Sequence, residues 1–422
     1  MKRQPLLPVL PVMWLMLVLA GCNSPVLQPF QSSGGLVIDQ EPFTRQIQIA
    51  INIKTVEIQH EGGNLTVMGW DQSYILVEGA KQAAAETVED AQAILNSIDI
   101  SAYESPINRM VIEYQDSQGF SWLSKPAGRI DYTAKVPRGI TLELKVKNGS
   151  VTVSDVDSDV WITHETGDVT AERIRANLDI RSTGNTSAGN QVRVRDVSSN
   201  VKLETKGTRL EVEQIGGNAE ITHQNGECRA RRIERDITFQ GNGAILTLQE
   251  VKGYINLDNR RGDVTCELFY DGIRAGVTNG SLRLEPQAPI TRSFECNVDT
   301  GNLILRIPES ASILVEIQAV DGSIHSDFPM PVRAEGNVSY ANGSINSGAT
   351  RVRLEVRRGI ASLLKTNPVL PVTPASAAVV PSNSIPPAPL IPASDLNPME
   401  SPRPRGGNGI KDGTEIKPDK LP

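Results

Sequence analysis

The chain has 422 residues, of which 22% are charged and only 4% are aromatic, and its formal net charge is −7. A nucleic-acid-binding domain would show clustered lysine and arginine over a basic surface, so we do not expect nucleic acid as a partner. The 35 glycines predict many tight turns between short strands.

The first residues have the pattern of an export signal. Lys2 and Arg3 precede an apolar run at 6–20, which is shorter than the roughly 20 residues of a membrane span and suits a signal-peptide core. The sequence LAGC at 19–22 resembles the lipobox of bacterial lipoproteins. That resemblance implies removal of a signal peptide, 1–21, and acylation of Cys22, for example with palmitate. The alternative is an ordinary cleaved signal that ends near a cysteine.

Acylation of Cys22 would attach the protein to a membrane, since each buried methylene contributes about 0.8 kcal/mol. Asn23 stands where an aspartate would signal retention at the inner membrane. We therefore expect an extracytoplasmic, membrane-anchored lipoprotein of the cell envelope, at the outer membrane if the cell has two. Residues 22–43 are interpreted as a tether. Residues 365–422 contain 13 of the 27 prolines, and we predict a disordered tail there.

The middle of the chain is an internal repeat, the feature to seek first in any sequence. Counting from Val151, apolar residues occur at offsets 0, 2, 5, 9 and 11, and the same offsets recur from residues 169, 192, 210, 228, 246 and 264. All 35 positions are apolar or cysteine, and one insertion near 183–190 lengthens a single step from 18 to 23 residues. Seven successive units therefore share one pattern.

Alternation with a period of two predicts strands that turn one face inward. A glycine shortly before most units, such as Gly149, Gly167 and Gly226, marks a corner, because glycine tolerates positive φ. Strands at a fixed spacing that cannot bury their face alone stack as coils. We therefore predict an all-β fold, a parallel β-helix (β-solenoid), over residues 148–364.

Outward positions provide an independent test of this stacking. Offset 3 contains Arg195, Glu213 and Arg231 in successive units, and alternating charge is what in-register parallel strands favour. The segment ITHQNGECRARRIER at 221–235 then has a plain interpretation. Arg229 and Arg231 face outward between glutamates of the preceding coil and neutral or acidic residues of later coils, and Cys228 points inward.

No catalytic, metal or cofactor site emerges from the residues. His164 and His223 share offset 13 but lie three coils apart, roughly 14 Å, too far for one zinc ion. Cys228 and Cys266 are two coils apart, about 10 Å, beyond disulfide reach, so we interpret them as buried hydrophobic residues, with Cys296. No outward column gathers the carboxylates that glycoside hydrolysis needs.

The N-terminal third, 44–147, is predicted to cap the solenoid with strands and one helix at 84–98, where apolar residues follow a helical stripe. The loop SQGFSWLSKPAG at 117–128 carries Phe120 and Trp122. These two aromatic residues are the candidate ligand contacts, for example by stacking on sugars. The alternative is a mobile loop that its aromatic residues anchor.

The segments GNLTVMGWD (63–71), YTAKVPRGITLELKVKNGSVTVSDV (132–156) and the recurring GDVT resemble the adhesin-type DUF4097 domain of bacterial envelope proteins. The resemblance covers residues 44–350 and implies a right-handed β-helix without catalytic residues.

Together these features predict a lipid-anchored binding or scaffold protein, not an enzyme, which presents an elongated solenoid to an envelope glycan or protein. The sequence does not indicate an oligomeric state. One alternative is a polysaccharide-acting enzyme of β-helix fold. The other is a non-catalytic component of an envelope-stress sensing assembly.

Overall fold

The computed structural model describes residues 37–116, 127–184, 190–287 and 289–366. The chain divides into two compact units, Met1–Pro368 and Val369–Pro422, and the second lies outside the described residues. The expected signal peptide with Cys22, the loop with Phe120 and Trp122, and the proline-rich tail also lie outside them. No helix of the described segments has the length and hydrophobicity needed to cross a lipid bilayer.

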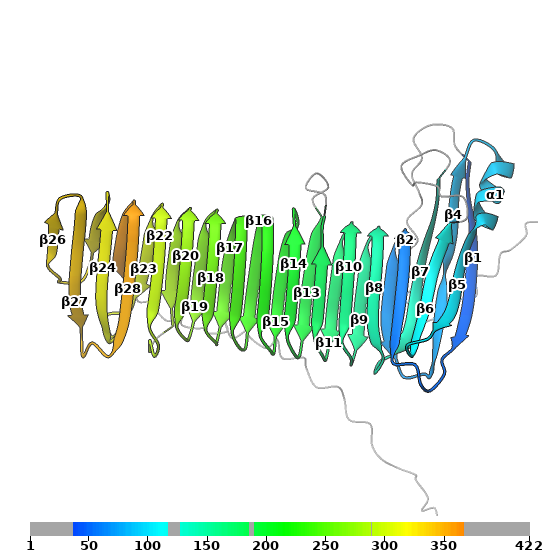
Figure 1. Cartoon of the computed structure of the whole chain (residues 1–422), viewed down its shortest axis with the longest axis horizontal. Helices are drawn as coiled ribbons and strands as arrows, with labels where there is room; N and C mark the ends of the chain where they lie inside the picture. Colours follow the sequence, from blue (N-terminus) through cyan, green and yellow to red (C-terminus); the bar gives the residue numbers. More distant parts are fainter. Residues whose placement is uncertain (1–36, 117–126, 185–189, 288, 367–422) are drawn as a thin grey trace, which may run out of the picture. The chain divides into compact units, whose positions relative to one another are not determined.

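The body of the first unit is a stack of coils, each made of two strands (Figure 1). Its strands are β8 (Thr141–Asn148), β9 (Val151–Val156), β10 (Val160–Thr166), β11 (Val169–Ile174), β12 (Leu178–Ser182), β13 (Gln191–Val197), β14 (Val201–Lys206), β15 (Arg209–Ile215), β16 (Ala219–Ile233), β17 (Ile237–Val251), β18 (Ile255–Arg261), β19 (Val264–Phe269), β20 (Ile273–Asn279), β21 (Leu282–Pro286), β22 (Phe294–Thr300) and β23 (Leu303–Ile307). Strands β16 and β17 each continue through a corner.

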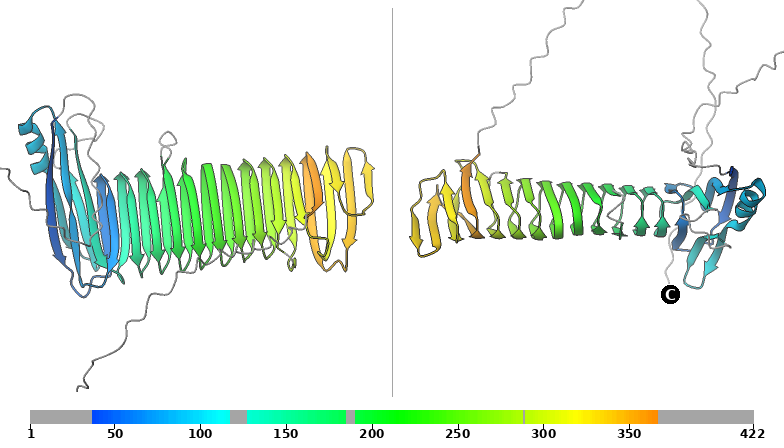
Figure 2. Two further views of the ribbon diagram at one scale, coloured as in Figure 1. Left: turned by 180° about the vertical axis from the view of Figure 1, so that it is seen from behind. Right: turned by 90° about the horizontal axis from the view of Figure 1, so that it is seen from above.

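Strands stack in parallel with the equivalent strand of the next coil. Strand β10 pairs with β8 and β12, whereas β11 pairs with β9 and β13. The solenoid therefore has two faces, called here the β10 face and the β11 face, and Figure 2 shows both layers from above. The predicted all-β solenoid is confirmed.

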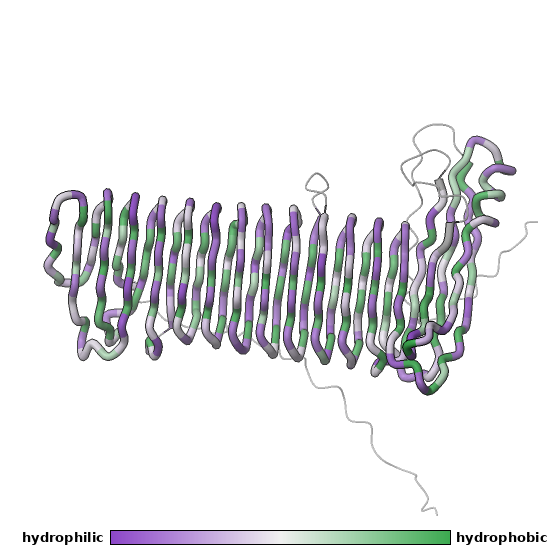
Figure 3. The backbone as a smooth tube through the Cα atoms, in the orientation of Figure 1, coloured by the Kyte–Doolittle hydropathy of each residue, from purple (hydrophilic) through white to green (hydrophobic). Residues whose placement is uncertain are grey.

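The predicted register is also confirmed. Val169 lies opposite Val151 on one side and Val192 on the other, and Arg195 lies opposite Glu213. All 35 repeat positions are buried, so each coil contributes five side chains to one continuous core. Figure 3 shows hydrophobic and hydrophilic residues following one another along the backbone of the coils. Burying a valine, leucine or isoleucine side chain stabilises by about 1.5–3 kcal/mol, which makes this core the main stabilising element.

Each of these coils has a residue with positive φ that the sequence did not reveal. It stands at offset 4, where the chain leaves the β11 face, and φ lies between 54° and 62° at Asp155, Arg173, Asp196, Gln214, Arg232, Glu250 and Leu268. Asp155 and Asp196 are aspartates, which adopt positive φ more readily than most residues, but the other five are Arg, Gln, Glu or Leu and give no such signal. The side chain at offset 5 can then point inward again, which explains the step from offset 2 to offset 5.

The corner glycines allow the coils to approach closely. Gly149 and Gly167 have φ of 114° and 126°, and a Cβ atom on Gly167 would lie 2.3 Å from the carbonyl oxygen of Gly149. The glycines predicted from the sequence are therefore required by backbone packing at this edge.

Charged side chains between coils pair as their order predicted. Arg193 Nε lies 3.2 Å from Glu211 Oε2, and Arg195 Nε lies 3.5 Å from Glu213 Oε2. Arg229, in the arginine-rich segment 221–235, pairs instead within its own strand, with Glu227 at 2.5 Å. These outward arginines therefore balance glutamates along the β11 face.

The N-terminal part consists of β1 (Val37–Gln48), β2 (Thr55–Gly62), β3 (Leu65–Trp70), β4 (Tyr74–Ala85), α1 (Val88–Ser97), β5 (Ile98–Ser105), β6 (Arg109–Asp116) and β7 (Ala127–Pro137). Strand β1 begins inside the segment expected to be a tether, so the boundary at residue 43 was wrong. It pairs antiparallel with β4 along its whole length. Most of its side chains are exposed, and the sequence pattern was therefore weak.

Helix α1 confirms the expected helix in a shorter form. It starts after Thr87, whose hydroxyl accepts a hydrogen bond from the Asp90 N–H at 3.1 Å. The expected first residues, 84–85, belong to β4. Ala91, Ile94 and Leu95 are buried, and the helix contacts β1 and β4.

Both ends of the stack depart from chain order. Strands β2 and β3 lie between β6/β7 and β8/β9, so the solenoid begins inside the predicted cap. The C-terminal strands are β24 (Ile313–Val320), β25 (Ser323–Ser326), β26 (Val332–Glu335), β27 (Val338–Ile345), β28 (Thr350–Arg358) and β29 (Ile360–Lys365). Strand β28 stacks between β22 and β24, as its orange colour shows in Figure 1.

The C-terminal end corrects two details of the sequence interpretation. The parallel coils predicted over residues 148–364 include the segment 343–345, but this segment ends β27, which pairs antiparallel with both β24 and β26. Lys365, expected to start the tail, is the last residue of β29. Glycine spacing alone does not separate a coil corner from a turn between antiparallel strands.

A column of polar side chains runs through the interior at offset 13. His164 Nε2 lies 2.8 Å from the Gly149 carbonyl oxygen, His223 Nδ1 lies 2.7 Å from Thr205 Oγ1, and the Asn259 amide donates to the carbonyls of Ala244 and Gly262. His60 occupies the same column in β2. His164 and Asn259 thus bond to backbone carbonyls at a corner, whereas His223 bonds to the side chain of the preceding coil.

Burial lowers the pKa of His60 and of His223 to about 4, and it also lowers the pKa of His164. The unfolded chain then binds protons that the folded chain excludes once the pH falls below about 6.5. The contribution of these histidines to the free energy of unfolding is therefore fully present above pH 6.5, and it is lost progressively as the pH falls toward 4. Each buried histidine contributes up to about 1.4 kcal/mol per pH unit.

We expect His223→Asn to reduce this pH dependence by one proton, because Asn259 shows that an amide fits the column. The free energy of unfolding, measured by urea denaturation at pH 7.5 and pH 5, tests this. His325→Asn changes an exposed ring and serves as the control. An unaltered slope in His223→Asn would show that this ring is not buried in its neutral form.

Candidate functional site

Two hollows formed by described residues are candidate ligand sites. The first, the face groove, is a hollow of about 740 Å³ that extends over successive coils along one border of the β10 face. The second, the junction pocket, is a hollow of about 250 Å³ near the N-terminal end of the stack. Among the described residues, no group of three or more His, Cys, Asp or Glu side chains is placed to hold a metal ion.

One wall of the face groove is a column of amides and carboxylates at offset 8, called here the amide column: Asp159, Asn177, Asn200, Asn218 and Asp236. The side-chain oxygens accept hydrogen bonds from the next coil. Asn177 donates both its backbone and its amide N–H to Asp159 Oδ1 at 3.0 Å, and the Asn218 N–H donates to Asn200 Oδ1 at 2.9 Å. The column therefore has a fixed geometry before any ligand arrives.

The other wall is the outward column at offset 10. Trp161, Asp179, Lys202 and Glu220 project from successive strands of the β10 face, in register with one another. The Trp161 side chain is 43% exposed, although a buried position is the usual one for so large an apolar ring. The groove thus combines one exposed aromatic ring with a regular series of polar groups.

Asp179 has the most unusual environment of the charged groups in the groove. Burial raises its pKa, and Lys202 partly offsets this effect. Lys202 Nζ lies 3.6 Å from Glu220, so this cation is shared with the next carboxylate along the column. A carboxylate in such a place favours a hydrogen-bond donor or a cation from a ligand.

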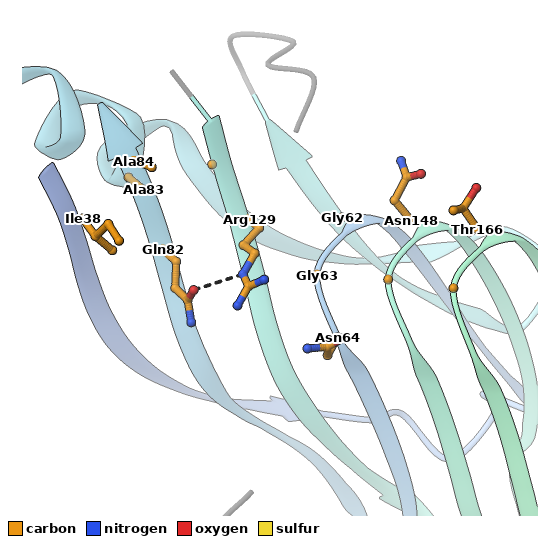
Figure 4. A pocket seen from close by; sticks show the side chains of 13 residues that line it. Ile38, Gly62, Gly63, Asn64, Gln82, Ala83, Ala84, Arg129, Asn148 and Thr166 are labelled. Carbon is orange, nitrogen blue, oxygen red and sulfur yellow. Dashed lines mark hydrogen bonds between the residues drawn. The ribbon is translucent and has the colours of Figure 1, made fainter. Parts of the chain in front are cut away.

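The junction pocket lies between β1, β4 and β7 on one side and the corners at Gly63, Gly149 and Gly167 on the other (Figure 4). Its wall is mostly small and apolar. The polar groups at its base are already paired, because Arg129 Nε donates to Gln82 Oε1 at 3.0 Å and Gln82 Nε2 donates to Asp131 Oδ2 at 3.2 Å. It therefore offers shape but few free hydrogen-bonding groups.

The β10 face also carries an ion network around the buried Glu57, beside the groove. Glu57 is 4% exposed and accepts hydrogen bonds from Arg109 and from Lys145. Burial opposes its ionisation, but the hydrogen bonds from Lys145 and Arg109 outweigh that effect and lower its pKa. Glu143 contacts the same two cations at 2.8 and 3.1 Å. Both carboxylates are thus neutralised, as in a structural network and unlike a catalytic pair.

The cysteines behave as the sequence predicted. Cys228, Cys266 and Cys296 are buried and unpaired, and burial raises the pKa of each thiol. A buried thiol with a raised pKa is a poor nucleophile.

The sequence interpretation did not single out the face groove. Phe120 and Trp122, its candidate ligand contacts, lie outside the described residues. The signal for the groove was nevertheless present, since every eighteen- or twenty-three-residue step from Asp159 to Asp236 falls on Asn or Asp. Trp161 was the only aromatic residue in the offset 10 column of the seven units.

Three comparisons place the chain among known proteins. It matches none of the curated proteins with which it was compared. A crystal structure of a provisionally designated cell adhesion protein from Clostridium sporogenes is similar at 9% identity over 78% of this chain and 100% of that one, with a TM-score of 0.20. A provisionally designated adhesin from Bacteroides fragilis shows 10% identity over 77% and 97%, with a TM-score of 0.22.

Values this low say nothing about the activity of the present chain. The family model Toastrack DUF4097, in contrast, matches residues 108–360, which is more than half of the 422 residues. The match includes most of the coil stack and the whole face groove. The chain belongs to the DUF4097 (Toastrack) family.

Proposed function

We propose that this protein is a lipid-anchored, non-enzymatic component of the cell envelope that binds a glycan along the face groove. The observation that carries the proposal is the position of Trp161 beside the amide column. One face of a pyranose ring presents C–H groups that pack on an aromatic ring. Its hydroxyl groups both donate and accept hydrogen bonds, which suits neighbouring amides and carboxylates.

The geometry favours a glycan over a protein partner. Protein interfaces have an apolar centre that is poor in charged residues, whereas this groove contains one exposed apolar side chain among polar ones. Its polar groups also repeat at the coil spacing of about 4.8 Å. A polymer of similar units can use such a repeat several times.

A polysaccharide-acting enzyme has less support. Asp179 and Glu220 lie two coils apart with Lys202 between them, and Glu57 and Glu143 are neutralised by cations. No contact of the described residues favours a role in an envelope-stress sensing assembly.

The anchoring part of the proposal is tested at Cys22. We expect the parent protein to partition into the detergent phase, because acyl chains contribute about 0.8 kcal/mol per buried methylene. Cys22→Ala should move it to the aqueous phase, with Cys228→Ala as the control for loss of a buried cysteine. Equal partitioning of the parent and Cys22→Ala would exclude lipidation at this residue.

The binding part is tested by Trp161→Ala in the full-length chain in detergent micelles. We expect its affinity for a bound envelope oligosaccharide to fall by about 1–3 kcal/mol, measured by calorimetry, since aromatic residues dominate contact energies. Tyr270→Ala removes a similarly exposed ring outside the groove and should bind like the parent. If the two variants bind equally, Trp161 is not part of the site. Cleavage of the oligosaccharide by the protein would contradict the non-enzymatic role and identify the protein as an enzyme.

A further inference from the structure

The charge of the face groove is strongly unbalanced. Four carboxylates line it, those of Asp159, Asp179, Glu220 and Asp236, against the single cation of Lys202. The neighbouring outward column at offset 12 does not share this imbalance, because Arg181 Nε lies 2.9 Å from Glu204 Oε2. The excess negative charge is therefore a property of the groove and not of the whole β10 face.

Asp179 is the carboxylate that remains available to a ligand. Asp159 and Asp236 each use one oxygen to accept a backbone N–H from the next coil, and Glu220 shares Lys202. Among the residues that the structure describes, none donates a hydrogen bond to Asp179 or forms a direct ion pair with it. Its pKa is raised by burial, so the carboxylate gains more than an exposed one would from a fixed cation.

The aromatic ring and this carboxylate are immediate neighbours. Trp161 and Asp179 lie directly opposite each other in the parallel pair β10–β12, where Cβ atoms are about 5 Å apart. That separation is close to the width of one sugar ring. A hexose that packs on Trp161 can therefore place a substituent against Asp179.

We propose that the face groove selects a glycan that carries free amino groups, an amino-sugar polymer in its cationic form. The inference depends on the proposed glycan-binding function and names the class of glycan. The ammonium group would donate hydrogen bonds to Asp179 while its ring packs on Trp161, a position in which cation–π attraction also contributes. An acidic glycan would meet four carboxylates in the same groove and be repelled.

The test compares three oligosaccharides with the full-length chain in micelles at low salt: a glucosamine oligomer, the N-acetylated oligomer of the same length, and a uronic acid oligomer. We expect the glucosamine oligomer to bind at least about tenfold more tightly than the N-acetylated one. The uronic acid oligomer should bind most weakly. The preference should diminish as salt screens the charges.

Asp179→Asn should remove most of the preference for the amine, because it should lower the affinity for the glucosamine oligomer much more than the affinity for the N-acetylated oligomer. Glu220→Gln should also reduce the preference for the amine, by a smaller amount. This variant provides the test if Asp179→Asn fails to fold. Asp258→Asn is the matched control, because Asp258 is an exposed carboxylate on the same face outside the groove. It should behave like the parent.

The outcomes separate this inference from the proposed function. Equal affinity for the amino and N-acetylated oligomers would overturn the inference and leave glycan binding intact. Binding of none of the three would overturn the glycan proposal itself. Tighter binding of a polylysine peptide than of the glucosamine oligomer would assign the groove to a basic protein segment and overturn the amino-sugar class. Retention of the amine preference by both Asp179→Asn and Glu220→Gln would show that these carboxylates do not create it.

Discussion

Hydrogen bonds between successive coils hold equivalent residues of neighbouring coils opposite each other, and the other features of the molecule follow from this constraint. Because the register does not slip, one apolar residue per coil becomes an unbroken buried column. The same constraint converts sequence periodicity into outward columns of amides, charges and one tryptophan. A shift by one residue would reverse every side chain and expose the core.

The register also determines how the two ends are closed. Successive parallel coils would leave pairing edges at both ends, and such edges can recruit other chains. Here β2/β3 and β28/β29 enter the stack out of chain order. Antiparallel pairing follows at the N-terminal end and beyond β28, whereas the short strand β25 covers β29 in parallel. The edge strand β1 contains Pro42 and several charged residues, a composition that opposes further pairing. The groove and the ion pairs thus lie on a stack that is terminated by its own chain.

Much of this fold could be predicted from the sequence because the signal is repeated. Seven copies of one apolar pattern predicted the register, the inward cysteines and the Arg195–Glu213 pairing. The ends were less predictable, since the order of β28/β29 depends on long-range pairing that no local pattern encodes. The positive φ at residues such as Glu250 was also hidden, because glycine or asparagine is the usual signal for it. The amide column was visible in the spacing, but its use as a groove wall depends on the side-chain positions around Trp161.

The most direct test of in-register stacking is a pair of engineered cysteines on adjacent coils. In Arg195→Cys/Glu213→Cys, the two residues lie directly opposite, at a separation within the limits of disulfide geometry. We expect mild oxidation to form an intramolecular disulfide, detected by mass spectrometry, without loss of the folded state. Arg195→Cys/Arg231→Cys places the thiols two coils apart, about 10 Å, and should not cross-link. A disulfide in the second variant but not in the first would contradict the register and, with it, the account of the core and the groove.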